Sequence, residues 1–303
     1  MCFIQFNANF KLDLVKKSFY VVFYSVVVYK KPLTNNDKGI SMKKLLCIAA
    51  LGLTASTTAM ADQILNDIKS SGELKVCFDS GYMPFEMTAK NGQYIGFDID
   101  LGKQMARAMG VKFVPVNTSW DGIIPTLLTG KCHMIMAGMT ITPMRNTQVN
   151  FSDPYVVIGQ SILVNPKHKG KVSSYRDLNN PDYVVATKLG TTGEQASKRY
   201  LPKAKQNLYE TQSEAVLEVA NGKVDALVYD FPYNSIYTAE NQGQLIHLSE
   251  PFTYEPLGWA VPQGNHDTIN FLNNYLRQIK GDGTYERIYD KWFNDDKWLK
   301  QVN

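Results

Sequence analysis

Short apolar runs alternate along the chain with longer segments whose apolar residues recur every three or four positions. The short runs are typical of buried strands and the longer segments of amphipathic helices. This alternation predicts an α/β protein. The predicted strands are 74–78, 113–117, 132–137, 183–187, 208–209, 225–229, 245–248 and 257–261. The predicted helices are 100–109, 120–129, 191–200, 213–220, 232–241, 269–280 and 283–293.

The strand–helix pattern occurs in two cycles. Gly130 and Gly222 each end a predicted helix, and each is followed by a Lys and a strand. Gly138 and Asp230 lie eight residues after these glycines, just past equivalent strand ends. Open α/β sheets bind ligands at that edge, so we expect two similar lobes with a cleft between them. The predicted limits are 62–156 plus 259–303 for lobe 1, 161–253 for lobe 2, and 156–160 and 254–258 for two crossings.

The N-terminal region has the order of features found in a cleavable signal peptide. A basic start at 42–44 precedes an apolar run at 45–58 and the small residues of 59–61. We therefore predict a signal peptide at 42–61, cleavage before Asp62, and a periplasmic protein. A membrane anchor is disfavoured because a spanning helix needs about 20 apolar residues. Residues 1–41 are expected to be a non-native upstream extension, the alternative being a genuine extension of unknown role.

Removing the leader changes the charge of the chain. The first 61 residues hold eight Lys and two Asp, so the formal net charge falls from +4 to −2. A basic surface for nucleic acid is therefore not expected.

Cys77 and Cys132 are the cysteines of the predicted exported chain. They could pair in an oxidising compartment. Each lies in an apolar run, however, and we favour buried free thiols. The four His are scattered without metal-site spacing, and neither a metal nor a cofactor is expected.

Two loops have the chemistry of an amino-acid site. Thr142 is a suitable N-cap and Pro143 suits the first helical position. Arg145 follows in that first turn, and its planar fork matches a carboxylate. In the second cycle, Thr191 and Glu194 have the spacing of a capping box. Each arrangement also occurs at ordinary capped helices, so neither is decisive alone.

Asp230 follows an apolar strand, where its carboxylate could pair with an α-ammonium group. Arg145 and Asp230 together match the two charges of an α-amino acid. Asp79 and Tyr82 follow the first strand, and Trp120 begins a helix. These two aromatic rings could enclose an aliphatic or amide side chain, although aromatic residues are as often part of a core.

Several segments in order resemble the polar amino-acid binding proteins of bacterial ABC transporters, periplasmic solute-binding protein family 3. The resemblance covers about 74–293. The segments are 81–86 (GYMPFE), 96–101 (GFDIDL), 120–127 (WDGIIPTL), 138–145 (GMTITPMR), 151–155 (FSDPY), 188–194 (KLGTTGE) and 228–232 (VYDFP). Each motif is weak alone, but the ordered set is specific.

The resemblance implies a type II periplasmic-binding-protein-like fold of two lobes that close by hinge motion. It implies a monomer that carries a free amino acid to an inner-membrane permease. By this resemblance, Arg145 binds the α-carboxylate with Thr140 and Thr192, and Gly138 and Asp230 bind the α-ammonium. Around the ligand's side chain it places Asp79, Tyr82, Trp120 and Lys188.

The combination of Lys188 with Asp79 resembles the pattern in the glutamine-binding members of the family. Lys188 disfavours a cationic ligand unless Asp79 neutralises it. Glutamine or a similar polar amino acid is therefore the favoured ligand, with basic or acidic amino acids as alternatives. A periplasmic cyclohexadienyl dehydratase has the same fold and is the alternative enzyme class. The Arg145–Asp230 pattern argues against it, because prephenate-like substrates need no ammonium group.

Overall fold

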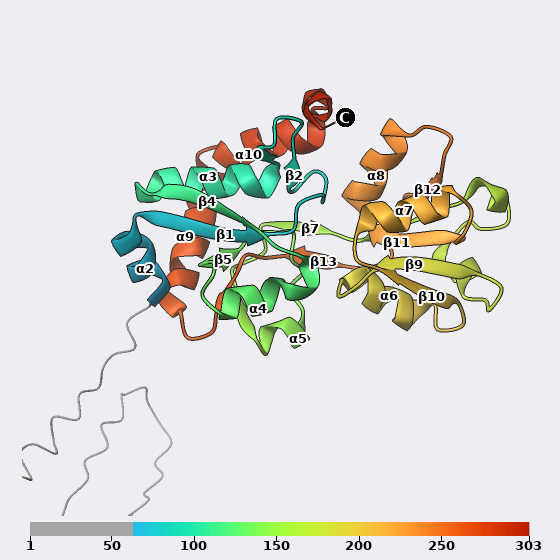
Figure 1. The fold of residues 1–303 in the computed structure, drawn as a ribbon, viewed down its shortest axis with the longest axis horizontal. Helices are drawn as coiled ribbons and strands as arrows, with labels where there is room; N and C mark the ends of the chain where they lie inside the picture. The colour runs from blue at the N-terminus through green and yellow to red at the C-terminus, as the bar shows by residue number, and fades with distance from the viewer. Residues whose placement is uncertain (1–62, 303) are drawn as a thin grey trace, which may run out of the picture. The chain divides into compact units, whose positions relative to one another are not determined.

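The computed structural model describes residues 63–302, so the predicted signal peptide and upstream extension lie outside the described residues. Residues 63–302 form two five-stranded sheets with helices packed on each (Figure 1). Within this range no helix is long and apolar enough to cross a membrane. The same residues contain no group of three or more His, Cys, Asp or Glu side chains that could hold a metal ion.

The first sheet has the strand order β4-β1-β5-β14-β6. Strands β4, β1 and β5 are parallel, whereas β14 is antiparallel to both β5 and β6. The strands of this lobe are β1 (Glu73–Phe78), β4 (Lys112–Asn117), β5 (Met134–Ile135), β6 (Val149–Phe151), β14 (Ala260–Pro262) and the small pair β2 (Met87–Thr88) and β3 (Tyr94–Ile95). Its helices are α2 (Gln63–Ser71), α3 (Phe97–Met109), η1 (Trp120–Gly122), α4 (Ile123–Leu128), α5 (Pro143–Asn146), α9 (His266–Gly281), α10 (Thr284–Tyr289), η4 (Asp290–Asn294) and η5 (Lys297–Gln301).

The second sheet has the order β10-β9-β11-β8-β12 and repeats the arrangement of the first. Strands β10, β9 and β11 are parallel, and β8 is antiparallel to β11 and β12. The strands are β8 (Gln160–Val164), β9 (Val184–Lys188), β10 (Lys205–Tyr209), β11 (Ala226–Asp230) and β12 (Ile246–Leu248). The helices are η2 (Pro166–His168), η3 (Tyr175–Leu178), α6 (Thr192–Tyr200), α7 (Gln212–Ala220) and α8 (Phe231–Glu240).

Strands β5 and β11 occupy the same place in their sheets. Gly138 lies three residues after β5, and Asp230 is the last residue of β11. The prediction that these two residues lie at the carboxyl ends of equivalent strands is confirmed, although Asp230 is still part of β11 and not past its end.

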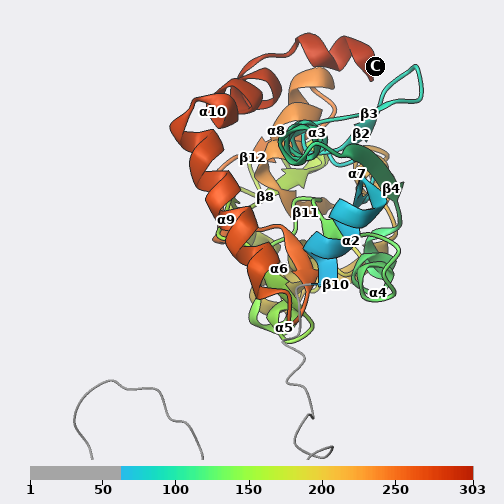
Figure 2. The ribbon, with the colours of Figure 1, turned by 90° about the vertical axis from the view of Figure 1, so that its left-hand side faces the viewer.

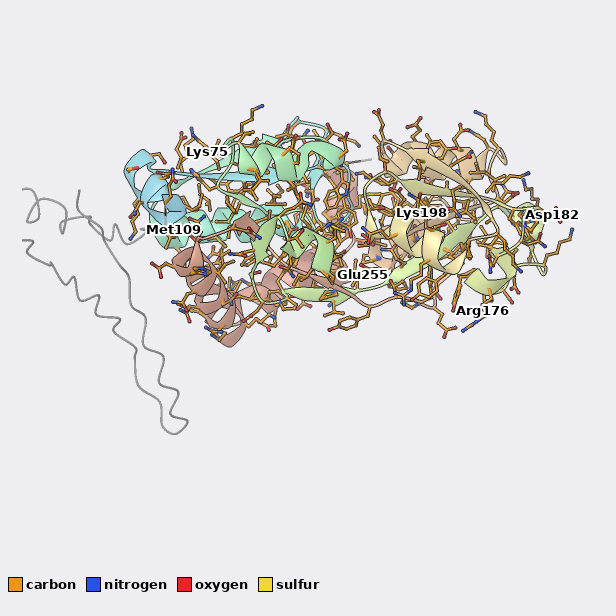
Figure 3. All side chains as sticks on the ribbon, turned by 90° about the horizontal axis from the view of Figure 1, so that it is seen from below. Lys75, Met109, Arg176, Asp182, Lys198 and Glu255 are labelled. Atoms are coloured by element: carbon orange, nitrogen blue, oxygen red, sulfur yellow. A yellow bond between two sulfur atoms is a disulfide. The ribbon has the colours of Figure 1, made fainter. Side chains whose placement is uncertain are left out.

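Strand β7 (Val156–Ile158) pairs antiparallel with β13 (Glu255–Leu257), and the two strands connect the sheets. Figure 3 labels Glu255 at this connection. The predicted crossings at 156–160 and 254–258 contain these strands, while their role as a hinge stays a prediction.

Helix α3 shows why the sequence pattern forms this lobe. Leu101 and Met105, four residues apart, are fully buried in the same core as Val76 of β1. On the other face of β1, Cys77 belongs to the core formed with α4. Gly110 ends α3 at a φ of 69°, where a glycine is favoured. Figure 2 shows α9 passing α2 and leading into α10, which packs against α3.

Three predicted elements differ from the observed ones. The predicted strand 257–261 is broken, because the N–H groups of Gly258 and Trp259 donate to Met139 O and Ser152 Oγ outside the strand pairing. The predicted strand 132–137 is paired only over Met134–Ile135, and the predicted helix 120–129 begins as a 3-10 turn. Strand β8 has no counterpart among the predictions.

The expectation of buried free thiols is wrong: Cys77 and Cys132 form a disulfide. Cys77 lies in β1 and Cys132 just before β5, the strand paired beside it. Their Cα atoms are 5.7 Å apart, within the range that a disulfide spans. Neighbouring apolar strands bring the two sulfurs together, and the sequence does not reveal which strands are neighbours.

Candidate functional site

A cavity between the two lobes collects nearly all the predicted site residues. The cavity is small and only partly closed off from solvent. Eight of the nine predicted residues line it: Asp79, Tyr82, Trp120, Gly138, Thr140, Lys188, Thr192 and Asp230. Glu86, Thr191 and Tyr229 complete the lining.

Arg145 is the ninth predicted residue and lies beside the cavity. Its side chain is almost fully buried, and its guanidinium donates to Thr140 O at 2.9 Å and Gly190 O at 3.2 Å. The guanidinium also lies 5.2 Å from the centre of the Trp120 ring. Burial lowers the pKa of Arg145 to about 10, against the opposing effect of Glu255 and Asp230. Arg145 therefore remains a cation at neutral pH.

Both predicted N-caps are present, but the predicted capping box of Thr191 and Glu194 is only half formed, because the Glu194 carboxylate accepts the N–H of Gly190 at 2.7 Å instead of that of Thr191. The Thr142 hydroxyl accepts the N–H of Arg145 at the start of α5, and Thr191 accepts the N–H of Glu194 at the start of α6. These caps fix the loops that bring Thr140 and Thr192 together, with their hydroxyls 3.3 Å apart. Because these threonines come from different lobes, the pair lies across the cleft.

Asp230 is a buried carboxylate with donors from both lobes. The hydroxyl of Tyr82 donates to one oxygen and the amide of Gln160 to the other. Burial raises the pKa of Asp230 to about 7, although both donors favour the ionised form. A cation next to this carboxylate would restore its charge.

Gly138 forms part of the cavity wall against Tyr82. Its φ is +56°, and an added Cβ would lie 2.3 Å from Cε1 of the Tyr82 ring. A side chain at this position would therefore displace Tyr82, the residue that donates to Asp230.

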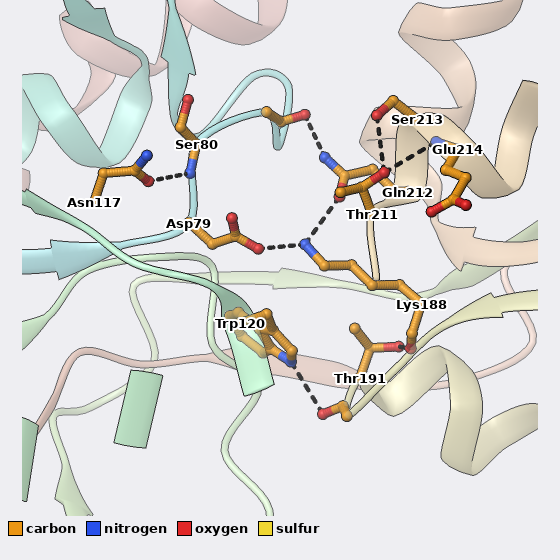
Figure 4. Close-up of polar contacts among 12 residues, drawn as sticks. Asp79, Ser80, Asn117, Trp120, Lys188, Thr191, Thr211, Gln212, Ser213 and Glu214 are labelled. Carbon is orange, nitrogen blue, oxygen red and sulfur yellow. Dashed lines mark hydrogen bonds and ion pairs between the residues drawn. The ribbon is translucent and has the colours of Figure 1, made fainter. Parts of the chain in front are cut away.

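Lys188 lines the cavity and joins the two lobes (Figure 4). Its ammonium contacts Asp79 at 2.5 Å and donates to Gln212 Oε1 at 2.9 Å. Gln212 in turn donates to Gly81 O at 2.5 Å. Nearby, the Trp120 indole donates to Gly190 O at 3.0 Å. Asp79, Gly81 and Trp120 lie in lobe 1, so these bonds connect the lobes directly.

Glu86 is a cavity residue that the sequence analysis missed as a functional group. It is 1% exposed, and neither carboxylate oxygen has a hydrogen-bond partner. Burial raises its pKa well above the usual value, with Asp98 and Asp79 adding to the effect and Lys188 opposing it. An uncompensated buried acid is costly, so Glu86 is a group that a ligand cation could satisfy.

Gln160 and Gln212 were missed as well. Each is at most 2% exposed and bonds a predicted site residue. Glu86 offered a weak signal, because it is an acid within the apolar run 84–87. The glutamines offered none, because their roles depend on contacts between residues at least 24 positions apart.

Comparison with known proteins defines the class. A family model for bacterial extracellular solute-binding proteins, family 3, matches residues 74–295. The chain belongs to this family, and both the predicted family and the predicted two-lobed α/β fold class are confirmed.

Particular relatives carry more specific names. A probable histidine-binding protein of Neisseria gonorrhoeae is 32% identical over 262 residues, covering 84% of this chain and 97% of the relative. A putative ABC-transporter binding component from Wolinella succinogenes, solved with lysine, is 50% identical with a TM-score of 0.73, covering 76% of this chain and 99% of that one. The ancestral amino-acid-binding protein AncCDT-1, a precursor of cyclohexadienyl dehydratase, is 48% identical with a TM-score of 0.72, covering 77% and 100%.

Proposed function

We propose that this protein binds one free α-amino acid in the cavity between its lobes and delivers it to an inner-membrane ABC permease. The observation that carries the proposal is the buried pair of opposite charges, Arg145 and Asp230, on the two sides of the cleft. Buried charges need partners, and an α-amino acid supplies one for each.

In this proposal Arg145 binds the ligand's carboxylate, with the hydroxyls of Thr140 and Thr192 on either side. A charge-assisted hydrogen bond of this kind contributes roughly 1.5–3 kcal/mol. Asp230 and the carbonyl of Gly138 bind the α-ammonium. The ligand's side chain lies among a further group of cavity residues: Asp79, Tyr82, Trp120, Lys188 and Glu86.

The charges around the cavity favour a ligand with a cationic side chain. Acidic side chains in and beside the cavity outnumber basic ones: Asp79, Glu86, Asp98, Asp230 and Glu255 against Arg145 and Lys188. A ligand cation would favour the ionised form of the buried acids. Asp79 already neutralises Lys188, which removes the main objection to a basic ligand. Glu86 then remains for the side-chain cation. Lysine or arginine therefore replaces glutamine as the favoured ligand, and the lysine complex of the Wolinella relative agrees with this choice.

The transport setting follows from the family and from the leader. Family membership makes this a solute-binding protein of the extracellular class. We propose that the segment 42–61 directs export, that the mature chain acts as a monomer in the periplasm, and that β7 and β13 are the hinge. The bonds that join the lobes beside the cavity support this, because they must break when the lobes separate.

A thermal-shift screen of the purified protein against the free amino acids tests the proposal. A ligand of the native state raises the melting temperature by mass action. We expect lysine or arginine to give the largest rise. No rise with any amino acid would contradict amino-acid binding as a whole.

An enzyme is the second candidate, because AncCDT-1 is a precursor of cyclohexadienyl dehydratase. Glu86 holds its proton more tightly than an ordinary carboxyl and could act as a general acid. Incubation with arogenate and prephenate separates the two functions. We expect no turnover, and product formation at a useful rate would support the enzyme.

A further inference from the structure

Asp98 is a buried carboxylate just behind the cavity wall. It is the second residue of α3 and is 1% exposed. Its Oδ2 accepts the N–H of Gly138 at 2.8 Å and the hydroxyl of Tyr155 at 2.8 Å. Gly138 lines the cavity, whereas Tyr155 immediately precedes the connecting strand β7. One carboxylate oxygen therefore joins the cavity wall to the start of a connecting strand.

The segment after the second connecting strand, β13, also lies near the Asp98 carboxylate. Trp259 lies two residues after β13, and its indole is near enough to Asp98 to favour the ionised carboxylate. The Tyr155 ring stacks on Trp259 with centroids 5.3 Å apart, and the Tyr155 N–H donates to Leu257 O. The lobe-1 ends of β7 and β13 thus meet beside the Asp98 carboxylate.

Asp98 is also linked to the proposed ammonium site, because Gly138, which it binds, packs against Tyr82. Gly138 has no room for a side chain because the Tyr82 ring occupies that space. Tyr82 in turn donates to Asp230. The Tyr82 ring therefore packs close to the Gly138 backbone, so the position of Gly138 bears on the ring that donates to Asp230.

We propose that Asp98 is a positioning residue for ligand binding: it bonds Gly138 and Tyr155 together and so couples the ammonium site to the connecting strands. Asp98 does not touch the ligand in this scheme. The inference rests on the proposed role of Gly138 and Asp230 in amino-acid binding. Its consequence is that lobe closure and alignment of the ammonium site occur together.

The ionised carboxylate is the form suited to this role, since hydrogen bonds to a charged acceptor are about twice as strong as neutral ones. Burial raises the pKa of Asp98 to about 7, while the hydrogen bonds from Tyr155 and Gly138 and the nearby Trp259 indole act in the opposite direction. Glu86 is a neighbouring acid, and the charge of Asp98 contributes to raising the pKa of Glu86. Measurements at pH 8 keep the carboxylate of Asp98 mainly ionised.

The test is calorimetric titration with L-lysine and L-arginine at pH 8. The variants are Asp98→Asn, Tyr155→Phe and the double variant, with the exposed Asp67→Asn as the matched control. We expect Asp98→Asn to weaken affinity by roughly tenfold and Tyr155→Phe by less. The double variant should bind lysine and arginine no more weakly than Asp98→Asn alone, because both substitutions break the same connection between Gly138 and Tyr155.

A purely structural role gives a different pattern. Each substitution would then lower the melting temperature of the ligand-free protein but leave its dissociation constants for lysine and arginine unchanged. The effects of the two substitutions on the melting temperature would be additive. That result would overturn the proposal. If Asp98→Asn does not fold, unchanged affinity in Tyr155→Phe would still overturn it. Failure of the unaltered protein to bind any amino acid would instead contradict the proposed function.

Discussion

Arg145 and Asp230 are a basic and an acidic side chain that the fold holds away from water without pairing them directly. Arg145 is held by two carbonyl groups and the face of Trp120, and Asp230 by a hydroxyl and an amide. Neither set of neighbours carries a full opposite charge. The ligand would supply both missing charges, which explains why each residue is buried at a cost in free energy.

Replacing Arg145 by Ala removes the partner of the ligand's carboxylate. We expect at least a hundredfold loss of affinity for every amino acid, because roughly 1.5–3 kcal/mol per charged hydrogen bond is lost from two bonds. Calorimetry measures the loss, with the exposed Arg107→Ala as the control. Unchanged binding in Arg145→Ala would remove it from the site.

Replacing Glu86 by Gln changes the preference among ligands. The amide keeps the shape but removes the charge that would face a cationic side chain. We expect affinity for lysine or arginine to fall roughly tenfold and affinity for glutamine to hold or rise. The exposed Glu214→Gln serves as the control, and equal losses for all ligands would refute selectivity by Glu86.

Ligand binding should tighten as pH rises through 7. Burial raises the folded-state pKa of Asp230 to about 7, and only the ionised form can pair with an ammonium group. Below pH 7, binding must first remove this proton, so affinity should fall by up to about tenfold per pH unit. Titrations from pH 5.5 to 8.5 measure the slope, which Asp230→Asn should reduce. A flat profile in the unaltered protein would contradict the assignment.

The proton on Asp230 also affects the free energy of unfolding of the ligand-free protein. This stability falls as pH rises, whereas ligand affinity increases. The ligand-free fold keeps the Asp230 proton up to about pH 7, whereas the unfolded chain loses it near 4. The contribution of Asp230 to stability therefore falls as pH rises from about 4 to 7. The stabilising effect of the ligand should accordingly be largest above pH 7.

At the scale of elements, the helices and strands with clear patterns were predictable. The four-residue spacing in α3 and the cap residues of α5 and α6 depend on neighbours in sequence, and each was found as expected. The break at Gly258–Trp259 was not predictable, because it depends on hydrogen bonds to residues more than 100 positions away. The role of Gln160 was missed because its bond to Asp230 joins residues 70 positions apart, and that of Glu86 because its burial depends on the packing of the whole lobe.

The disulfide is the element-scale feature whose prediction failed. It joins β1 to the segment before β5 across a sequence separation of 55 residues. Replacing both Cys77 and Cys132 by Ala should lower the free energy of unfolding by about 2–4 kcal/mol. Denaturant titration measures this loss. Amino-acid affinity should change little, and a large loss of affinity would show that the disulfide also shapes the site.

At the scale of the whole molecule, closure is stabilised by bonds between the lobes. Lys188 and Gln212 of lobe 2 reach Asp79 and Gly81 of lobe 1. A ligand's apparent affinity scales with the fraction of protein able to close. The bonds of Gln212, which lies outside the cavity lining, should therefore affect all ligands alike, whereas Glu86, Asp79 and Lys188 face the ligand's side chain.

Gln212→Ala tests this view because Gln212 does not line the cavity. Losing its bonds should weaken every ligand by the same factor, roughly three- to tenfold. The exposed Gln263→Ala is the control, and the ratio of lysine to glutamine affinity is the readout. A change in that ratio would mean that Gln212 acts on the ligand's side chain.

The central claim is that the cavity binds a free amino acid whose side chain is cationic. Its most direct test is calorimetric titration of the unaltered protein with L-lysine, L-arginine and L-glutamine at pH 8. We predict one ligand per protein and at least tenfold tighter binding of lysine or arginine than of glutamine. Tighter binding of glutamine, or binding of none of the three, would contradict the account.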